Sequence, residues 1–208
     1  LGIYLSGHPL EKYRNIMEKM ISARTIDFQP DDETGIPKVY DGQKVIIGGM
    51  ITEKTIKYTR NNKVMAFLTV EDLMGTVEIV VFPRDYEKWQ TLINEDARVF
   101  IQGRVNAEDD KPSKLILEKV RAFDDIPREI WIQFKDREDY AQKEQELLNY
   151  LRGSVGTSAV VIYLKDVKAI KRLPAGYHVQ ISEFLIEELK KKYGDSNVKV
   201  VERVLKNF

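Results

Sequence analysis

Residues 64–82 read Val-Met-Ala-Phe-Leu-Thr-Val-Glu-Asp-Leu-Met-Gly-Thr-Val-Glu-Ile-Val-Val-Phe, and this stretch decides the fold. Its two ends, 64–70 and 77–82, are rich in β-branched and aromatic residues, a composition that favours strands. Between them, residues 71–75 include the polar residues and glycine of a hairpin loop. The stretch therefore predicts two neighbouring antiparallel strands.

The sequence on both sides of this hairpin extends the β pattern. A long β-rich run precedes it and contains Gly48-Gly49, a pair that marks a bulge or a sharp coil of the strand. The expected elements are a strand at 45–58, a turn at 59–62, a helix at 83–93 that Pro83 opens, and strands at 99–105 and 115–120 around the loop 106–113. Three strands, a helix and two strands is the order of the OB-fold, a five-stranded Greek-key barrel that commonly binds oligonucleotides.

Two further regions flank the predicted barrel. The N-terminal region reads as a helix that starts at Ser6-Gly7-His8-Pro9, followed by a linker arm over 29–41. The C-terminal region reads as a small α/β domain, with strands at 130–134, 159–164, 179–181 and 198–201 and helices at 138–151 and 182–193. The fold class is thus mixed β and α/β, with expected domains at 1–40, 41–126 and 127–208.

The composition limits where the protein acts and what it binds. The 208 residues hold 33 Lys+Arg against 33 Asp+Glu, so any nucleic-acid site depends on local charge. There is no cysteine, which fits a reducing compartment such as the cytoplasm. No apolar run approaches the ~20 residues that span a bilayer, so no membrane contact is expected. The chain starts with Leu1, so we expect the natural N-terminus to lie upstream.

The sequence offers little for catalysis. It has no phosphate-binding Walker loop, no dinucleotide glycine fingerprint and no serine or cysteine nucleophile signature. His8 and His178 lack metal-ligand spacing, and Asp31-Asp32 belong to the expected linker. We expect no catalytic residue, no metal, no cofactor and no small-molecule substrate, and therefore a binding role.

Strand parity indicates the face that binds. Side chains alternate along a strand, so Val77, Ile79 and Val81 fit the barrel interior, while Phe67, Glu78 and Phe82 lie outside. An exposed aromatic ring suits base stacking. The alternative is that Phe67 packs under the N-terminal arm.

A local cluster of charge adjoins this face. Residues 44–63 carry five cations and one carboxylate, beside polar side chains that suit bases and phosphates. The candidate nucleic-acid-binding residues are Lys54, Lys57, Tyr58, Arg60, Asn61, Lys63, Phe67, Glu78 and Phe82. The alternative is a solvated hairpin tip. The acidic loop Glu108-Asp109-Asp110 would repel a phosphate backbone, so we place the site at the first loop.

The decapeptide Leu1-Gly2-Ile3-Tyr4-Leu5-Ser6-Gly7-His8-Pro9-Leu10, together with the barrel segments 65–72 and 75–83, resembles the alpha subunit of bacterial DNA polymerase III. The resemblance implies the C-terminal end of that polymerase. Its OB domain would hold single-stranded template DNA, and its last domain would contact replisome proteins such as the clamp loader. The family's catalytic aspartates have no counterpart here, so polymerase activity would belong to the parent protein only.

Other interpretations stay open. The same barrel occurs as the anticodon-binding module of class II aminoacyl-tRNA synthetases, where a phenylalanine and a polar residue on the next strand read bases. Phe67 and Glu78 match those positions. A third possibility is a scaffold that binds only protein. A sliding-clamp peptide is approximated by Gln145, Leu148 and Tyr150, but these residues fall inside an expected helix.

Overall fold

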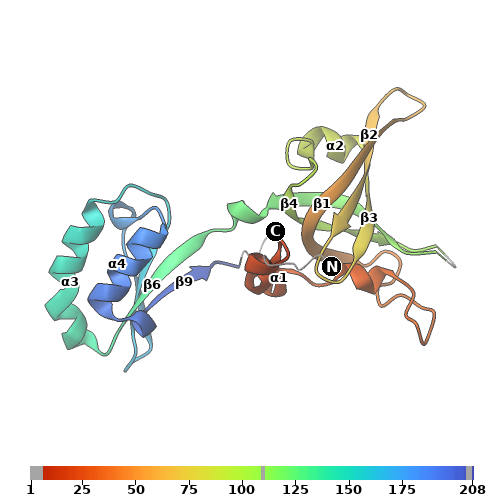
Figure 1. Cartoon of the computed structure of the whole chain (residues 1–208). Helices are drawn as coiled ribbons and strands as arrows, with labels where there is room; N and C mark the ends of the chain where they lie inside the picture. The colour runs from red at the N-terminus through yellow and green to blue at the C-terminus, as the bar shows by residue number, and fades with distance from the viewer. Residues whose placement is uncertain (1–6, 109–110, 205–207) are drawn as a thin grey trace. The chain divides into compact units, whose positions relative to one another are not determined.

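The computed structural model describes residues 7–108, 111–204 and 208, which form two compact units. The first, called here the barrel unit, runs through Asp125 and takes in Val204, and the second unit is Ile126–Arg203. Each has its own hydrophobic core. The segment before Tyr40, which the sequence sets apart, belongs to the barrel unit. Figure 1 shows the elements of both units.

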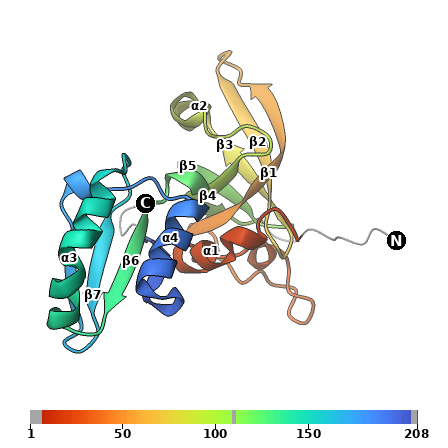
Figure 2. The same ribbon diagram turned by 60° about the vertical axis from the view of Figure 1, so that its left-hand side comes forward.

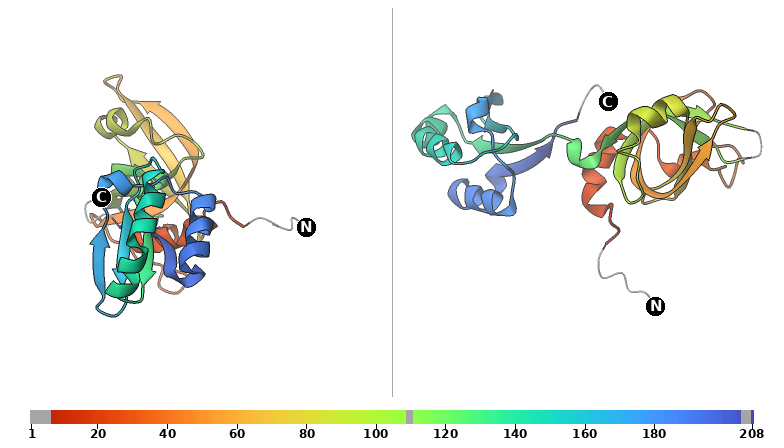
Figure 3. Two further views of the ribbon diagram at one scale, coloured as in Figure 1. Left: turned by 90° about the vertical axis from the view of Figure 1, so that its left-hand side faces the viewer. Right: turned by 90° about the horizontal axis from the view of Figure 1, so that it is seen from above.

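Five strands close the barrel in the order β1-β2-β3-β5-β4. Neighbouring strands are antiparallel, apart from the parallel pair β3 and β5. The elements are β1 (Lys44–Tyr58), β2 (Val64–Glu71), β3 (Thr76–Val81), α2 (Pro83–Trp89), β4 (Arg98–Asn106) and β5 (Lys114–Ala122). Their curvature around a ring is visible in the right-hand view of Figure 3. The five-stranded OB-fold prediction is confirmed.

The first strand, β1, pairs with two neighbouring strands. Residues from Lys44 to Met50 pair with β4, and residues from Met50 to Tyr58 pair with β2. Gly48 and Gly49 lie at the transition, where a Cβ on Gly49 would stand 2.4 Å from the Glu71 carbonyl oxygen. The expected sharp coil is therefore present. The irregularity in strand register lies later, between Ile51 and Glu53. At the glycines, the close approach of the two backbones requires only that side chains be absent, and no residue is inserted there.

Strand parity fills the barrel interior as the sequence predicts. The inward side chains of β2 and β3 are 0–2% exposed and consist of Ala66, Leu68, Val70, Val77, Ile79 and Val81. Burial of this apolar surface stabilises the barrel at roughly 25 cal/mol per Å². The outward side chains of the same strands are therefore free to form a surface.

The N-terminal segment packs against the outside of the barrel. It contains η1 (Glu11–Tyr13), α1 (Arg14–Met20) and η2 (Thr25–Phe28), so the helix begins later than the expected Ser6 start, which lies outside the described residues. Tyr13 stacks edge-on against Phe123 at 4.9 Å, and Phe123 contacts Phe100 at 4.3 Å. Leu10 and Met17 of this segment are buried.

The second unit is a four-stranded sheet with the order β8-β7-β6-β9. Its elements are β6 (Arg128–Phe134), α3 (Arg137–Arg152), β7 (Val160–Leu164), β8 (Ala169–Arg172), η4 (Ala175–Tyr177), α4 (Glu183–Tyr193), η5 (Asp195–Asn197) and β9 (Val198–Glu202). Both helices contribute to one core with Ile130, Ile132 and Phe134. They therefore cover the same face of the sheet, and Figure 2 shows them beside β6 and β7.

One strand of the second unit was placed wrongly from the sequence. The expected strand at 179–181 is only an isolated bridge between Ser158 and Val179. The actual strand is β8, whose four residues are all exposed and therefore lack the alternation that sequence analysis uses. A tight turn at Lys168, with φ of 54°, folds it back onto β7.

The glycine contact in β1 gives a test of barrel closure. Gly49→Ala should lower the free energy of unfolding of the barrel by about 1–3 kcal/mol, because its Cβ would overlap backbone atoms. Urea unfolding followed by Trp89 emission, in a Trp131→Phe background, measures this. The control is Gly176→Ala, where nothing lies within 4 Å of the added Cβ. Equal stability of the two variants would contradict the close approach.

Candidate nucleic-acid interface

The outer face of β1, β2 and β3 forms a continuous surface, called here the outer face. The strand register places Thr55 opposite Phe67 and Phe67 opposite Val80. Directly paired residues of antiparallel strands project to the same side. The paired positions on this side are Glu53, Thr55 and Lys57 on β1, Met65, Phe67 and Thr69 on β2, and Glu78 and Val80 on β3.

Phe67 lies at the middle of this face. Its ring is half-buried, and Lys57 Nζ lies 4.8 Å from the ring centroid. An ammonium in this position is attracted to the ring by its quadrupole. The N-terminal segment meets β2 at its far end, where His8 Nε2 lies 3.0 Å from Glu71 Oε1. Phe67 therefore presents part of its ring beside a cation, as a stacking site requires.

The hairpin that joins β1 and β2 carries exposed cations. Thr59 closes the turn through Lys63, and Asn62 takes a φ of 61°, a conformation that asparagine tolerates. Arg60, Asn61 and Lys63 are exposed. Within residues 7–108, 111–204 and 208, no ion pair involves Lys57, Arg60 or Lys63. These three positive charges are therefore available to an anionic ligand.

Two of the predicted residues lie on the other side of the hairpin. Lys54 alternates away from Phe67, and its Nζ lies 5.4 Å from the Tyr86 ring centroid and 3.3 Å from Asn94 Oδ1. Tyr58 shares that parity and is 68% exposed. A groove on this side is lined by Lys63, Val64, Pro83, Arg84, Tyr86, Glu87 and Gln90. The structure thus divides the predicted set between two surfaces of one hairpin.

Glu78 and Phe82 complete the outer face. Glu78 Oε1 lies 3.5 Å from Lys114 Nζ, so this carboxylate is partly neutralised. Phe82 follows β3 and is 45% exposed. Of the acidic loop, Asp109 and Asp110 lie outside the described residues. Glu108 Oε2 forms an ion pair with Lys111 Nζ at 2.7 Å.

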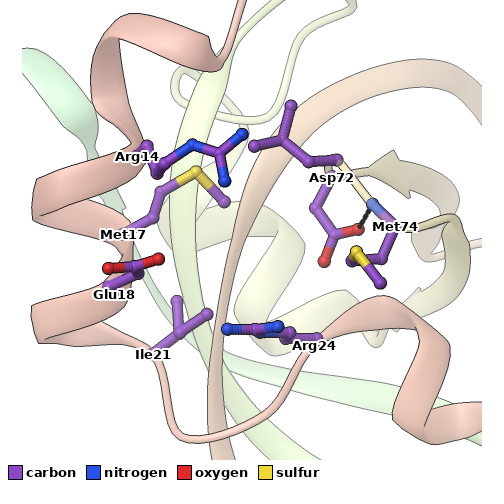
Figure 4. A pocket seen from close by; sticks show the side chains of 8 residues that line it. Arg14, Met17, Glu18, Ile21, Arg24, Asp72 and Met74 are labelled. Carbon is purple, nitrogen blue, oxygen red and sulfur yellow. Dashed lines mark hydrogen bonds between the residues drawn. The ribbon is translucent and has the colours of Figure 1, made fainter.

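A separate concavity lies between α1 and the β2–β3 loop. Figure 4 shows Arg14, Met17 and Arg24 around it, facing Met74 of the loop. Asp72, a buried carboxylate, organises this loop because it accepts hydrogen bonds from Thr25 Oγ1 at 2.6 Å and from the Met74 backbone N–H at 2.8 Å. Asp72 is therefore structural: it holds η2 against the loop, and its oxygens are already occupied.

The described part of the chain holds no group of three or more His, Asp or Glu side chains that could bind a metal ion. None of its helices is long and apolar enough to cross a bilayer. The outer face combines an aromatic ring, aliphatic and threonine side chains, two glutamates and the Lys57 ammonium.

Strand parity in the sequence places Met65 and Thr69 on the same side as Phe67, and the same rule applied to β1 finds Thr55. The sequence does not reveal Lys114, because this lysine reaches Glu78 through the parallel pairing of β3 with β5, which joins distant segments. Local patterns carry no signal for such a contact.

Comparisons with known proteins agree with the barrel fold. Residues 45–122 match the family model of the OB-fold nucleic acid binding domain. The chain is 26% identical over 208 residues to the DNA polymerase III subunit alpha of Bacillus subtilis, which covers 95% of this chain and 17% of that protein. It is 29% identical over 177 residues to that of Borreliella burgdorferi, covering 80% and 14%. The resemblance to this polymerase subunit is confirmed, and the chain spans about a sixth of its length.

The comparison with solved structures gives partial matches such as the following one. The SSB domain of a Synechococcus sp. protein covers 40% of this chain and 97% of its own length, with 16% identity and a TM-score of 0.35.

The geometry of Phe67 gives a direct test. Phe67→Ala should weaken binding of a labelled poly-dT oligonucleotide roughly 5- to 150-fold, because one stacked base contributes about 1–3 kcal/mol. Fluorescence anisotropy measures the affinity. Phe184→Ala is the matched control, since Phe184 is a 71% exposed phenylalanine on α4. Unchanged affinity in Phe67→Ala would remove the outer face as the stacking site.

Proposed function

We propose that the outer face of the barrel binds single-stranded DNA, and that the chain is a non-catalytic, C-terminal part of a polymerase of the DNA polymerase III alpha type. One observation carries the proposal: a partly exposed phenylalanine lies at the centre of an outer barrel face, beside cations that have no carboxylate partner in the described chain. The similarity to the polymerase subunits supplies the biological setting. DNA synthesis itself would belong to the whole polymerase.

In this proposal the strand crosses β2 and β3 with its bases toward the protein. A base that stacks on Phe67 shifts the Lys57 ammonium from the ring to a neighbouring phosphate, a small change for a flexible side chain. Arg60 and Lys63 hold the phosphates that leave the face along the hairpin. Phe82 offers a second ring beyond β3.

The charge distribution makes the interaction weak and tolerant of sequence. The whole chain has a formal net charge of zero, so attraction has to arise from local groups of cations such as the one at the hairpin. The outer face has no rigid helix that could read base edges in a duplex groove. Within a polymerase, the covalent connection would raise the effective concentration of the strand at this face.

A second candidate is an anticodon-binding-like module that reads RNA bases. Glu78 favours it, because this carboxylate is exposed on the strand next to Phe67 and can accept hydrogen bonds from base amino groups. Parallel titrations with oligo-dT and oligo-U separate the two, since contact with a 2′-hydroxyl would favour RNA. A scaffold that binds only protein would bind neither oligonucleotide.

The same proposal includes contacts with replisome proteins, such as a clamp-loader subunit, through the second unit, and a cytoplasmic location. The clamp-like residues Gln145, Leu148 and Tyr150 lie within the continuous helix α3, so an extended clamp peptide is not available there. Co-elution of the chain with a purified clamp-loader subunit in gel filtration tests the contact. Independent elution at micromolar concentrations would contradict it.

Salt dependence tests the role of the hairpin cations. Arg60→Ala with Lys63→Ala should reduce the slope of log affinity against log salt by about 1.4, since each lost phosphate contact accounts for about 0.7 on a single strand. Oligonucleotide anisotropy at several salt concentrations measures the slope. The control is Lys19→Ala with Lys190→Ala, two helical lysines without an ion pair in the described structure. An equal loss in both double variants would mean that the hairpin has no special part.

A further inference from the structure

The second unit has a sheet face that neither helix covers. Its core takes one set of alternating side chains, so the other set, called here the open face, projects to the opposite side. The side chains on this side are Glu129, Trp131 and Gln133 on β6, Val161 and Tyr163 on β7, Ile170 and Arg172 on β8, and Lys199 and Val201 on β9. Of these, Glu129 and Val161 are buried, and the others are partly or fully exposed. Figure 2 labels β6 and β7, the two strands that carry the aromatic residues of the open face.

Two aromatic rings form the centre of the open face. Trp131 and Tyr163 are both partly exposed, with ring centroids 6.4 Å apart and planes at 43°. A pocket of about 200 Å³ opens beside them and is lined by Trp131, Gln133, Tyr163, Ser196, Asn197, Lys199 and Val201. Such a pocket combines flat apolar walls with hydrogen-bonding groups at its edge, which suits a planar heterocycle.

Hydrogen bonds hold the polar side chains at the rim of this pocket, but they do not use every hydrogen-bonding atom there. Gln133 Nε2 donates to Asn197 Oδ1 at 3.3 Å, and Asn197 Nδ2 donates to the Tyr193 carbonyl oxygen at 2.7 Å. The Gln133 side-chain oxygen accepts no hydrogen bond from the described residues. The rim therefore offers an oriented acceptor at the edge of the aromatic walls.

The charges of the open face favour an anion. Its carboxylate, Glu129, is 4% exposed and accepts hydrogen bonds from Arg172 and from Trp131 Nε1. Burial raises the pKa of Glu129, but these hydrogen bonds and the charges of Arg172 and Arg203 bring the pKa below its ordinary value. Glu129 is thus ionised and neutralised internally, and Lys199 remains exposed beside the pocket.

We propose that the open face of the second unit is a second binding site for single-stranded nucleic acid, in which a base stacks on Trp131 and Tyr163 and Lys199 holds an adjacent phosphate. In the RRM, a four-stranded sheet stacks the bases of single-stranded RNA on its exposed aromatic rings in this way. The proposal is independent of the barrel site, because it rests on different residues in a different unit.

Tryptophan fluorescence tests this proposal in the 208-residue chain. The chain has two tryptophans, so Trp89→Phe leaves Trp131 as the single reporter. Titration with a poly-dT oligonucleotide should quench Trp131 saturably, and Tyr163→Leu should weaken that transition roughly 5- to 100-fold. Lys199→Glu should weaken it and reduce its salt slope by at least about 0.7, whereas Lys190→Glu on α4 serves as the charge control.

The barrel and the open face can fail separately in this experiment. Quenching that persists in a Phe67→Ala background supports the open face even if the barrel site is wrong. Oligonucleotide binding by anisotropy with unchanged Trp131 emission overturns the proposal and leaves this face to a protein partner. Quenching that is equal in Lys199→Glu and Lys190→Glu also overturns it.

Discussion

The barrel depends on one strand that pairs with two neighbours. β1 hydrogen-bonds to β4 up to Met50 and to β2 beyond it, so the sheet closes on itself. This requires the backbone to pass very close to β2, and Gly49 permits the approach because a side chain there would overlap the Glu71 carbonyl. A closed barrel leaves few unpaired strand edges and buries one side chain set completely. Its outer set is then free for binding.

The same strand also shapes the outer face that we propose as the binding surface. Because β1 continues past the barrel with β2, the hairpin carries Lys57, Arg60 and Lys63 next to the outer face that Phe67 occupies. The cations have no ion-pair partner among the residues described, and because the overall charge is neutral, any attraction for an anion depends on such local groups.

Much of this arrangement follows from the sequence, because alternation and turn residues are local signals. Turn residues and strand composition predict the order of the barrel elements. Strand parity predicts the inward set of β2 and β3 and the outward position of Phe67. The same parity places Lys54 on the other side of the hairpin, a distinction that charge counting ignores. The Lys114–Glu78 pair and the exposed edge strand β8 arise from long-range pairing and lack of alternation, so no local pattern predicts them.

Photochemical cross-linking tests the central claim, that bases contact the outer face of the barrel, most directly. An oligonucleotide carrying 5-bromodeoxyuridine would be irradiated with the chain, and tryptic peptides would be analysed by mass spectrometry. If bases lie on the outer face, adducts should form on the peptide of residues 64–84, which holds both Phe67 and Phe82. Cross-linked protein whose adducts avoid this peptide would show that the bases lie elsewhere.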